Sequence, residues 1–200
     1  MPTVLLIPGL SNSGPDHWQS HWEAAYPNFR RVVQDDWLAP RSEDWIERLQ
    51  ATVTATDGPV FLAAHSLGCC LVAQWAATVG PLVQGALLVA PSDTEAPSYP
   101  QGTTGFETMP LQSLPFPTIV AASTDDFYVS VDRAQAFARA WGAEFALLGP
   151  RGHIGTAAKL GMWPEGMRLL RKLQADARAD GNRGRISLPV PRPLPRAKRW

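Results

Sequence analysis

Short apolar runs alternate with amphipathic stretches along most of the 200-residue chain. Most of these runs are apolar without interruption, which is typical of parallel strands covered on both faces. The predicted strands are Thr3–Ile7, Arg31–Gln34, Pro59–Ala64, Gly85–Ala90, Thr118–Ala122 and Glu144–Leu148. Strands that alternate with helices predict an α/β fold, with a mostly parallel sheet of about six strands, right-handed crossovers and helices on both faces.

Helices are expected where apolar residues recur at helical spacing between capping signals. Ser130 can cap a helix that Gly142 ends. Ser42 precedes two acids that suit the first turn of a second helix, and Pro164 suits the first turn of a third. The predicted core positions are Ala134, Phe137, Ala138 and Trp141 in the first, Trp45, Ile46, Leu49 and Val53 in the second, and Met167, Leu170 and Leu173 in the third.

Two segments interrupt the alternation. Pro91–Pro117 is rich in Pro, Ser, Thr and Gly, and predicts a long excursion over one end of the sheet, in which a short helix can form. Residues 178–200 carry seven basic residues against one acid, Asp180, with prolines at every second position from Pro189 to Pro195. We therefore expect one folded domain over residues 1–177 and a disordered basic tail over residues 178–200.

Composition and charge narrow the function classes. Hydrophobic residues make up 45% of the chain and charged residues 18%, as in a globular domain with a core. A net charge of +0 argues against a nucleic-acid-binding domain. Only the tail could contact a polyanion, and we prefer the hypothesis that it is a solvated extension.

The chain shows no sign of export or membrane insertion. It begins without the basic and apolar regions of a signal peptide, and no run approaches the roughly 18 apolar residues of a membrane span. The adjacent Cys69 and Cys70 do not suit a disulfide. These features predict a reduced, cytoplasmic protein with no membrane partner.

The strongest chemical signal is the segment from Val60 to Gly68, in which an apolar strand ends in His65-Ser66-Leu67-Gly68 and turns into a helix over Cys69–Ala77. This is the pattern of a nucleophile elbow, which projects a serine hydroxyl from a sharp turn. The position two residues before the serine is Ala64, where glycine is common.

A nucleophilic serine needs a base and an orienting carboxylate. Asp125 and Asp126 follow one predicted strand, and His153 follows the last strand, so all the candidates lie at carboxyl ends of strands. The order serine, acid, histidine is that of α/β-hydrolases. We favour Asp126 over Asp125 because a hydrophobic residue, Val129, lies three positions beyond it.

The other histidines are weaker candidates. His65 is expected to pack beside the site. His17 and His21 have helical i, i+4 spacing, but position 18 is Trp rather than the Glu of a zinc protease motif, and no third ligand is evident. We therefore predict no metal and expect their rings to pack near the site.

An oxyanion hole requires two backbone N–H groups. We assign one to Leu67, which follows the candidate nucleophile, and the other to Leu10, in the loop after the first strand. That loop, residues 8–14, lacks the Gly-Lys-Ser/Thr ending of a phosphate loop and the glycine spacing of a dinucleotide site.

Taken together, these motifs resemble the small single-domain serine hydrolases that include retinoblastoma-binding protein nine and its bacterial relatives. The resemblance covers approximately residues 1–175 and leaves out the tail. It rests on Pro8-Gly9-Leu10 with Gly14-Pro15-Asp16-His17-Trp18, Trp37 with Pro40 and Trp45, His65-Ser66-Leu67-Gly68, Ser123-Thr124-Asp125-Asp126, and Gly152-His153-Ile154 with Trp163-Pro164-Glu165-Gly166. The resemblance implies an α/β-hydrolase fold with little or no lid, a triad of Ser66, Asp126 and His153, and no cofactor.

The sequence departs from the family pattern at Ala64 and at Gly155-Thr156-Ala157, where more polar residues are expected and where the pocket rim could differ. The leading hypothesis is hydrolysis of a carboxylic ester, thioester or small amide through an acyl-enzyme. The alternative is a protein-interaction module that keeps the fold and a vestigial site.

Overall fold

A computed structural model describes residues 1–78, 82–97 and 99–183 of the chain. Six strands form one sheet in the order β2-β1-β3-β4-β5-β6, and every neighbouring pair is parallel. The strands are β1 (Thr3–Ile7), β2 (Phe29–Arg31), β3 (Val60–His65), β4 (Gly85–Val89), β5 (Thr118–Ala122) and β6 (Glu144–Leu147). The described helices are α1 (Trp18–Ala25), α2 (Ser42–Thr54), α3 (Leu67–Thr78), α4 (Val131–Trp141) and α5 (Pro164–Arg183), with a short 3-10 helix, η1 (Thr156–Ala158).

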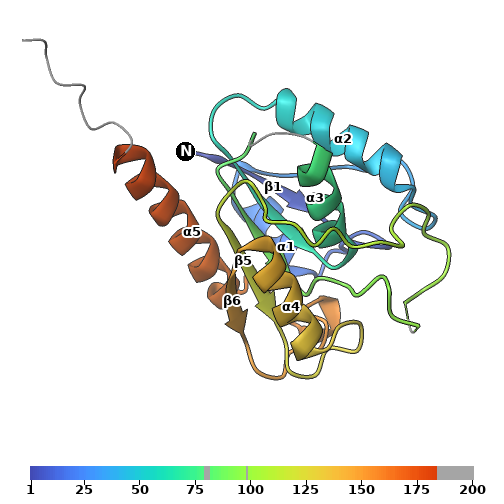
Figure 1. Ribbon diagram of the computed structural model, residues 1–200. Helices are drawn as coiled ribbons and strands as arrows, with labels where there is room; N and C mark the ends of the chain where they lie inside the picture. Colours follow the sequence, from blue (N-terminus) through green and yellow to red (C-terminus); the bar gives the residue numbers. More distant parts are fainter. Residues whose placement is uncertain (79–81, 98, 184–200) are drawn as a thin grey trace, which may run out of the picture.

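Helices cover both faces of the sheet, as the sequence predicts (Figure 1). The core on one face joins strand side chains to α2, α3 and α4, and the core on the other face joins them to α1 and α5. Alternate residues of the central strands β1, β3, β4 and β5 enter the two cores, so Leu62 packs on the first face and Phe61 on the second. This accounts for the uninterrupted apolar runs, because neither face meets solvent.

The central strands match the predicted ranges closely, whereas one edge strand does not. The predicted strand Arg31–Gln34 is wrong, because β2 spans Phe29–Arg31. Phe29 is buried while Val33 is 62% exposed, so the apolar pair at positions 32 and 33 does not mark a covered strand. Strand β2 lies at the edge of the sheet and has one buried residue, so it leaves a weaker hydrophobic signal than the central strands.

The capping signals correspond to observed helix ends. The Ser130 hydroxyl accepts a hydrogen bond from the Arg133 N–H at 3.2 Å, and Gly142 ends α4 in the left-handed conformation at φ 67°. Pro164 is the first residue of α5. The predicted faces are also confirmed, since Phe137, Leu49, Leu170 and most of their helical partners are buried.

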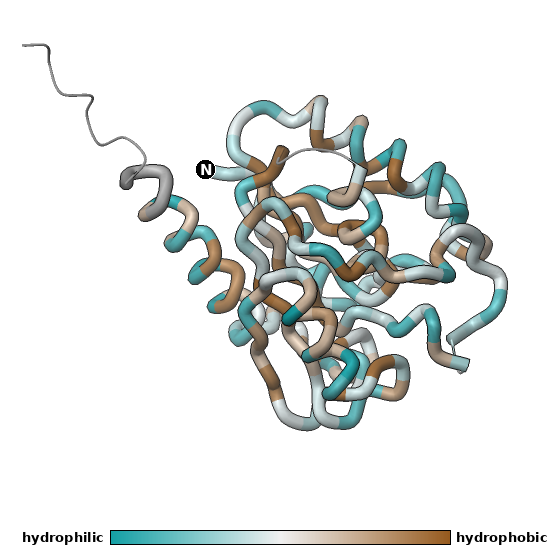
Figure 2. The backbone as a smooth tube through the Cα atoms, viewed as in Figure 1, coloured by the Kyte–Doolittle hydropathy of each residue, from teal (hydrophilic) through white to brown (hydrophobic). Residues whose placement is uncertain are grey.

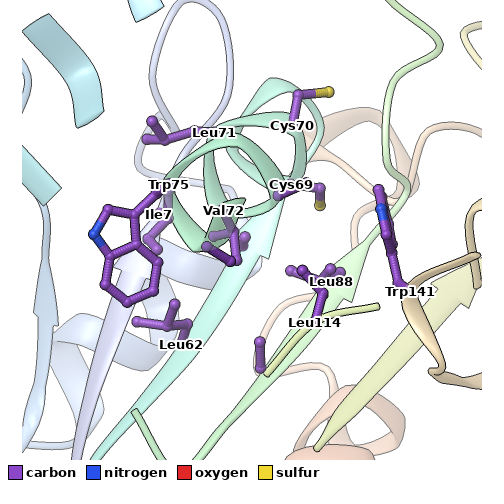
Figure 3. Packing of buried hydrophobic residues seen from close by; sticks show 14 of the residues in the cluster. Ile7, Leu62, Cys69, Cys70, Leu71, Val72, Trp75, Leu88, Leu114 and Trp141 are labelled. Atoms are coloured by element: carbon purple, nitrogen blue, oxygen red, sulfur yellow. The ribbon is translucent and has the colours of Figure 1, made fainter. Parts of the chain in front are cut away.

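Helix α3 is buried along almost its whole length. Figure 3 shows its side chains among those of the strands, with Val72 above Leu62 and Leu88. Cys69 and Cys70 are free thiols within this core. The burial of α3 ties the start of the helix firmly to the centre of the sheet, which fixes the turn that precedes it.

The structure describes most of the predicted excursion Pro91–Pro117 but only the first residues of the predicted tail 178–200. Within residues 91–97 and 99–117 there is no helix, so the excursion consists of loops and turns alone. Helix α5 continues through Arg178 to Arg183, which corrects the predicted start of the tail at residue 178. Residues 184–200 lie outside the described residues. The predicted disorder of the tail over these residues therefore stays a prediction.

Hydrophobic residues gather on the strands and hydrophilic ones on the outer side of α2 (Figure 2). None of the described helices is both long enough and apolar enough to span a bilayer.

Candidate active site

A strained turn between β3 and α3 holds Ser66. Its φ of 58° lies in the left-handed region, which a residue with a side chain rarely adopts. Hydrogen bonds fix the turn on both sides, from the Ser66 N–H to the Val89 carbonyl at 3.0 Å and from the Cys69 N–H to the Ser66 carbonyl at 2.9 Å. The geometry is that of the predicted elbow, and the fully buried Ala64 fits beneath it.

Two glycines allow the backbone to approach this turn closely. A Cβ atom on Gly9 would lie 2.7 Å from the Ser66 Cβ, and one on Gly68 would lie 2.7 Å from the Pro8 carbonyl oxygen. Neither position has room for a side chain. The loop after β1 and the start of α3 are therefore packed directly against each other around Ser66.

Ser66, His153 and Asp126 form a continuous chain of hydrogen bonds. The Ser66 Oγ lies 2.8 Å from His153 Nε2, and His153 Nδ1 lies 2.8 and 2.9 Å from the two carboxylate oxygens of Asp126. The Asp126 side chain is 0% exposed, whereas that of His153 is 21% exposed. The structure thus brings together the three residues that the sequence nominates.

The two neighbouring aspartates have different partners. Asp126 contacts His153 and also accepts a hydrogen bond from the Tyr128 N–H at 2.8 Å. Asp125 points elsewhere, because its Oδ1 accepts hydrogen bonds from the Arg151 N–H at 2.9 Å and the Gly152 N–H at 2.7 Å. The hydrogen bond from the Ser123 hydroxyl lowers the pKa of Asp125 most, and the bonds from these two N–H groups lower it further. Asp125 therefore anchors the loop that carries His153.

His65 supports the same loop from the other side. Its Nε2 lies 2.8 Å from the backbone carbonyl oxygen of His153, which can only accept, so His65 Nε2 carries the proton and donates. Burial, followed by the neighbouring histidines His153 and His17, lowers the pKa of His65 well below its usual value. The ring is therefore neutral and acts as a fixed hydrogen-bond donor.

His17 lies beside His65, with 4.7 Å between the ring centres. Its Nδ1 accepts a hydrogen bond from the Gln19 N–H and so caps α1. Burial, with a smaller contribution from Arg31, lowers the pKa of His17 to about 3. Within the described residues, no three His, Cys, Asp or Glu side chains gather into a set that could hold a metal ion.

Aromatic residues of α1 hold the segment that follows His153. The Trp18 Nε1–H donates to the Ile154 carbonyl at 3.0 Å, and the Trp22 Nε1–H donates to the Met162 carbonyl at 2.8 Å. Both indole rings also lie against Trp163. The His17-Trp18 motif thus supports the His153 loop from beneath, as expected for rings that pack near the site.

The Leu67 N–H is at the start of α3, directly after Ser66, and Leu10 is in the loop that Gly9 places against the elbow. In the described part of the chain, neither N–H donates to another residue. Both positions therefore leave a backbone donor available beside Ser66.

A cavity of about 580 Å³ opens over Ser66 and His153. Its further lining comes from the end of β3, from η1 and from the loops after β1, β4, β5 and β6, and includes Leu10, Ser11, Asn12, His17, His65, Ser92, Tyr99, Pro100, Tyr128, Pro150, Arg151, Gly152, Gly155, Thr156, Ala157 and Ala158. Ser92, Tyr99 and Pro100 belong to the excursion that the sequence places over the sheet. The Tyr99 ring lines the cavity, whereas the aromatic rings of Trp18, Phe106 and Trp163 are buried in the core.

Ser92 contacts the candidate nucleophile, although no motif in the sequence identifies it as a site residue. The Ser92 Oγ lies 2.9 Å from the Ser66 Oγ, and Ser92 is only 2% exposed. Ser92 follows the carboxyl end of β4, next to the strand that carries the elbow. That position in the chain is the signal that could have identified it, because neighbouring parallel strands end at one edge of the sheet.

A known protein family matches most of the chain. The serine hydrolase family matches residues 4–172. The chain belongs to this family. The match confirms the resemblance to small serine hydrolases that the motifs indicate, whereas no curated protein sequence matches the chain significantly.

Solved structures of other proteins are also similar to the chain. A YdeN-like hydrolase from Pectobacterium atrosepticum is 29% identical, with a TM-score of 0.79 over 88% of this chain and 92% of the other. The ydeN gene product of B. subtilis is 20% identical, with a TM-score of 0.74 over 88% of this chain and 100% of the other. The second likeness shows the fold, and the predicted α/β-hydrolase fold is confirmed.

Proposed function

We propose that this serine hydrolase cleaves carboxylic ester or thioester bonds of small molecules through an acyl-enzyme on Ser66. The observation that carries the proposal is the unbroken hydrogen-bond chain from Ser66 through His153 to Asp126 beneath an open cavity. A volume of about 580 Å³ is in the range of small-molecule sites.

Acylation begins when Ser66 Oγ attacks the carbonyl carbon and its proton passes to His153 Nε2. Asp126 holds the imidazole by accepting from Nδ1, which keeps Nε2 free to take that proton. The N–H groups of Leu67 and Leu10 donate to the oxygen that becomes negative. When the bond to the leaving group breaks, His153 returns the proton to the departing oxygen or sulfur.

Deacylation repeats these steps with water as the nucleophile. His153 Nε2 takes a proton from water as its oxygen bonds to the acyl carbon. The bond between that carbon and Ser66 Oγ then breaks, and the proton passes to Oγ. The products are a carboxylic acid and a free enzyme, and no step needs a metal or cofactor.

The alternative function, an interaction module with a vestigial site, predicts that at least one part of this arrangement has decayed. Instead, the described residues include a strained serine, a base, a buried acid and two available N–H groups. The completeness of the set favours catalysis.

Stopped-flow kinetics with p-nitrophenyl acetate tests the proposal. We expect a burst of one p-nitrophenol per active site, and a fall in kcat by about four to six orders of magnitude in Ser66→Ala and His153→Ala. Ser113→Ala, at an exposed serine outside the cavity lining, is the matched control and should keep wild-type rates. A folded wild type without turnover on short-chain esters and thioesters would overturn the proposal.

A further inference from the structure

Ser92 shares a hydrogen bond with the proposed nucleophile, and the available protons determine its direction. The Asp126 carboxylate accepts from His153, so His153 Nδ1 carries a proton and Nε2 of the neutral ring has only a lone pair. Ser66 must donate its one proton to that lone pair. The 2.9 Å contact between the two serines is therefore a bond from the Ser92 hydroxyl to Ser66 Oγ.

The surrounding structure holds Ser92 in place. Ala90, two residues before it, has a φ of 49°, which turns the chain sharply after β4, and its N–H donates to the Ala121 carbonyl at 2.8 Å. The next residue, Asp93, donates its N–H to the Tyr128 carbonyl at 3.1 Å. The Cys70 thiol donates to the Ser92 carbonyl at 3.4 Å. Ser92 is thus anchored to β5, to the loop of Asp126 and to α3.

We propose that Ser92 is a positioning residue for Ser66. Its hydroxyl occupies one lone pair of Ser66 Oγ and leaves the Ser66 proton directed at His153 Nε2. The same hydroxyl donates to Oγ as negative charge builds there during proton transfer. This inference rests on the proposed function, because it concerns the reactivity of Ser66 as a nucleophile.

The bond from Ser92 strengthens when Oγ loses its proton and weakens again in the acyl-enzyme, where Oγ is an ester oxygen. A donor to a developing charge lowers a barrier more than it stabilises the neutral ground state. Removal of the Ser92 hydroxyl should therefore slow acylation by about 10- to 100-fold. Binding of the ester before reaction should not change.

The test is the pre-steady-state burst with p-nitrophenyl acetate, which separates the acylation rate constant from the dissociation constant of the ester. We expect Ser92→Ala to lower the rate constant and to leave the dissociation constant and the midpoint of the pH–rate profile unchanged. Ser92→Thr, which keeps a hydroxyl, should restore most of the rate. Ser92→Cys, which is similar in size but a weak donor, should resemble Ser92→Ala.

Thr118→Val is the matched control. Thr118 is a buried hydroxyl residue and the first residue of β5, so it lies at the edge of the sheet opposite the site. Its hydroxyl donates to the Phe116 carbonyl at 3.0 Å. This variant should keep the wild-type acylation rate. A slower rate in Ser92→Ala then cannot be explained by the removal of a buried hydroxyl alone. Circular dichroism of each variant confirms the fold.

The outcomes separate the two proposals. A wild type without a burst refutes the proposed function, and the role of Ser92 with it. A wild-type burst with Ser92→Ala within twofold of it refutes the role of Ser92 alone. If Ser92→Ala fails to fold, Ser92→Cys decides, because a folded Cys variant that acylates at the wild-type rate overturns the proposal.

Discussion

Gly68→Ala should damage the elbow, because Gly68 is the point where α3 meets the end of β1. A Cβ atom there would lie 2.7 Å from the Pro8 carbonyl oxygen and closer still to that of Ile7. Both contacts are to backbone, which cannot rotate away as a flexible side chain can. The helix start and the loop after β1 must therefore separate by roughly half an ångström or more.

Such overpacking costs about 1–3 kcal/mol of unfolding free energy. Activity should fall further, because the shift moves Ser66 on one side of the contact and Leu10 on the other. Misplacement of reacting groups by about 1 Å can cost on the order of 100-fold in rate. We expect a loss of about 10- to 100-fold in kcat/KM for p-nitrophenyl acetate.

Urea unfolding measures the stability and ester hydrolysis measures the rate. Gly14→Ala is the matched control, because a Cβ atom there meets nothing within 4 Å. It should leave both quantities near the wild-type values. If Gly68→Ala is as stable and as active as Gly14→Ala, the close approach at Gly68 does not hold the site, and the reasoning fails.

Two further predictions concern charges near the site. Asp126→Asn should lower kcat by about 10⁴-fold, because the amide cannot hold the correct tautomer of His153. Asp125→Asn should lower kcat far less, because Asp125 does not contact His153. The kcat values of the two variants on the same ester check this prediction. The free energy of unfolding should fall as the pH drops from 6.5 towards 3, since the folded state keeps His17 neutral while the unfolded state protonates it. Its contribution is about 1.4 kcal/mol per pH unit within that window. His17→Asn, which keeps an acceptor for the Gln19 N–H, should flatten the curve measured by urea unfolding, and an unchanged curve would count against the assigned neutral state.

The central strands and the elbow could be predicted because the same physical constraint gives both. A parallel strand buried on two faces must be apolar throughout, and the residues that follow it meet at one edge of the sheet. Ser66 and Asp126 follow two such strands and His153 follows edge strand β6, so the order of the elements predicts that the three residues converge. The structure brings Ser66, Asp126 and His153 together at that edge.

Other features depend on details that the pattern does not carry. Asp125 and Asp126 have the same chemistry, and only the N–H groups of Arg151 and Gly152 decide which one turns away from His153. The approach of Ser92 to Ser66 depends on the sharp turn at Ala90. The predicted range Arg31–Gln34 misses most of edge strand β2, because Phe29, the one buried residue of that strand, is followed by two arginines.

The most direct test of the account is to treat the purified protein with a fluorophosphonate and locate the adduct by peptide mass spectrometry. The account predicts one adduct per chain, on the peptide that contains Ser66, and none on a folded Ser66→Ala variant. A folded wild type that stays unmodified, or an adduct that persists in Ser66→Ala, would contradict the claim that Ser66 is the activated nucleophile.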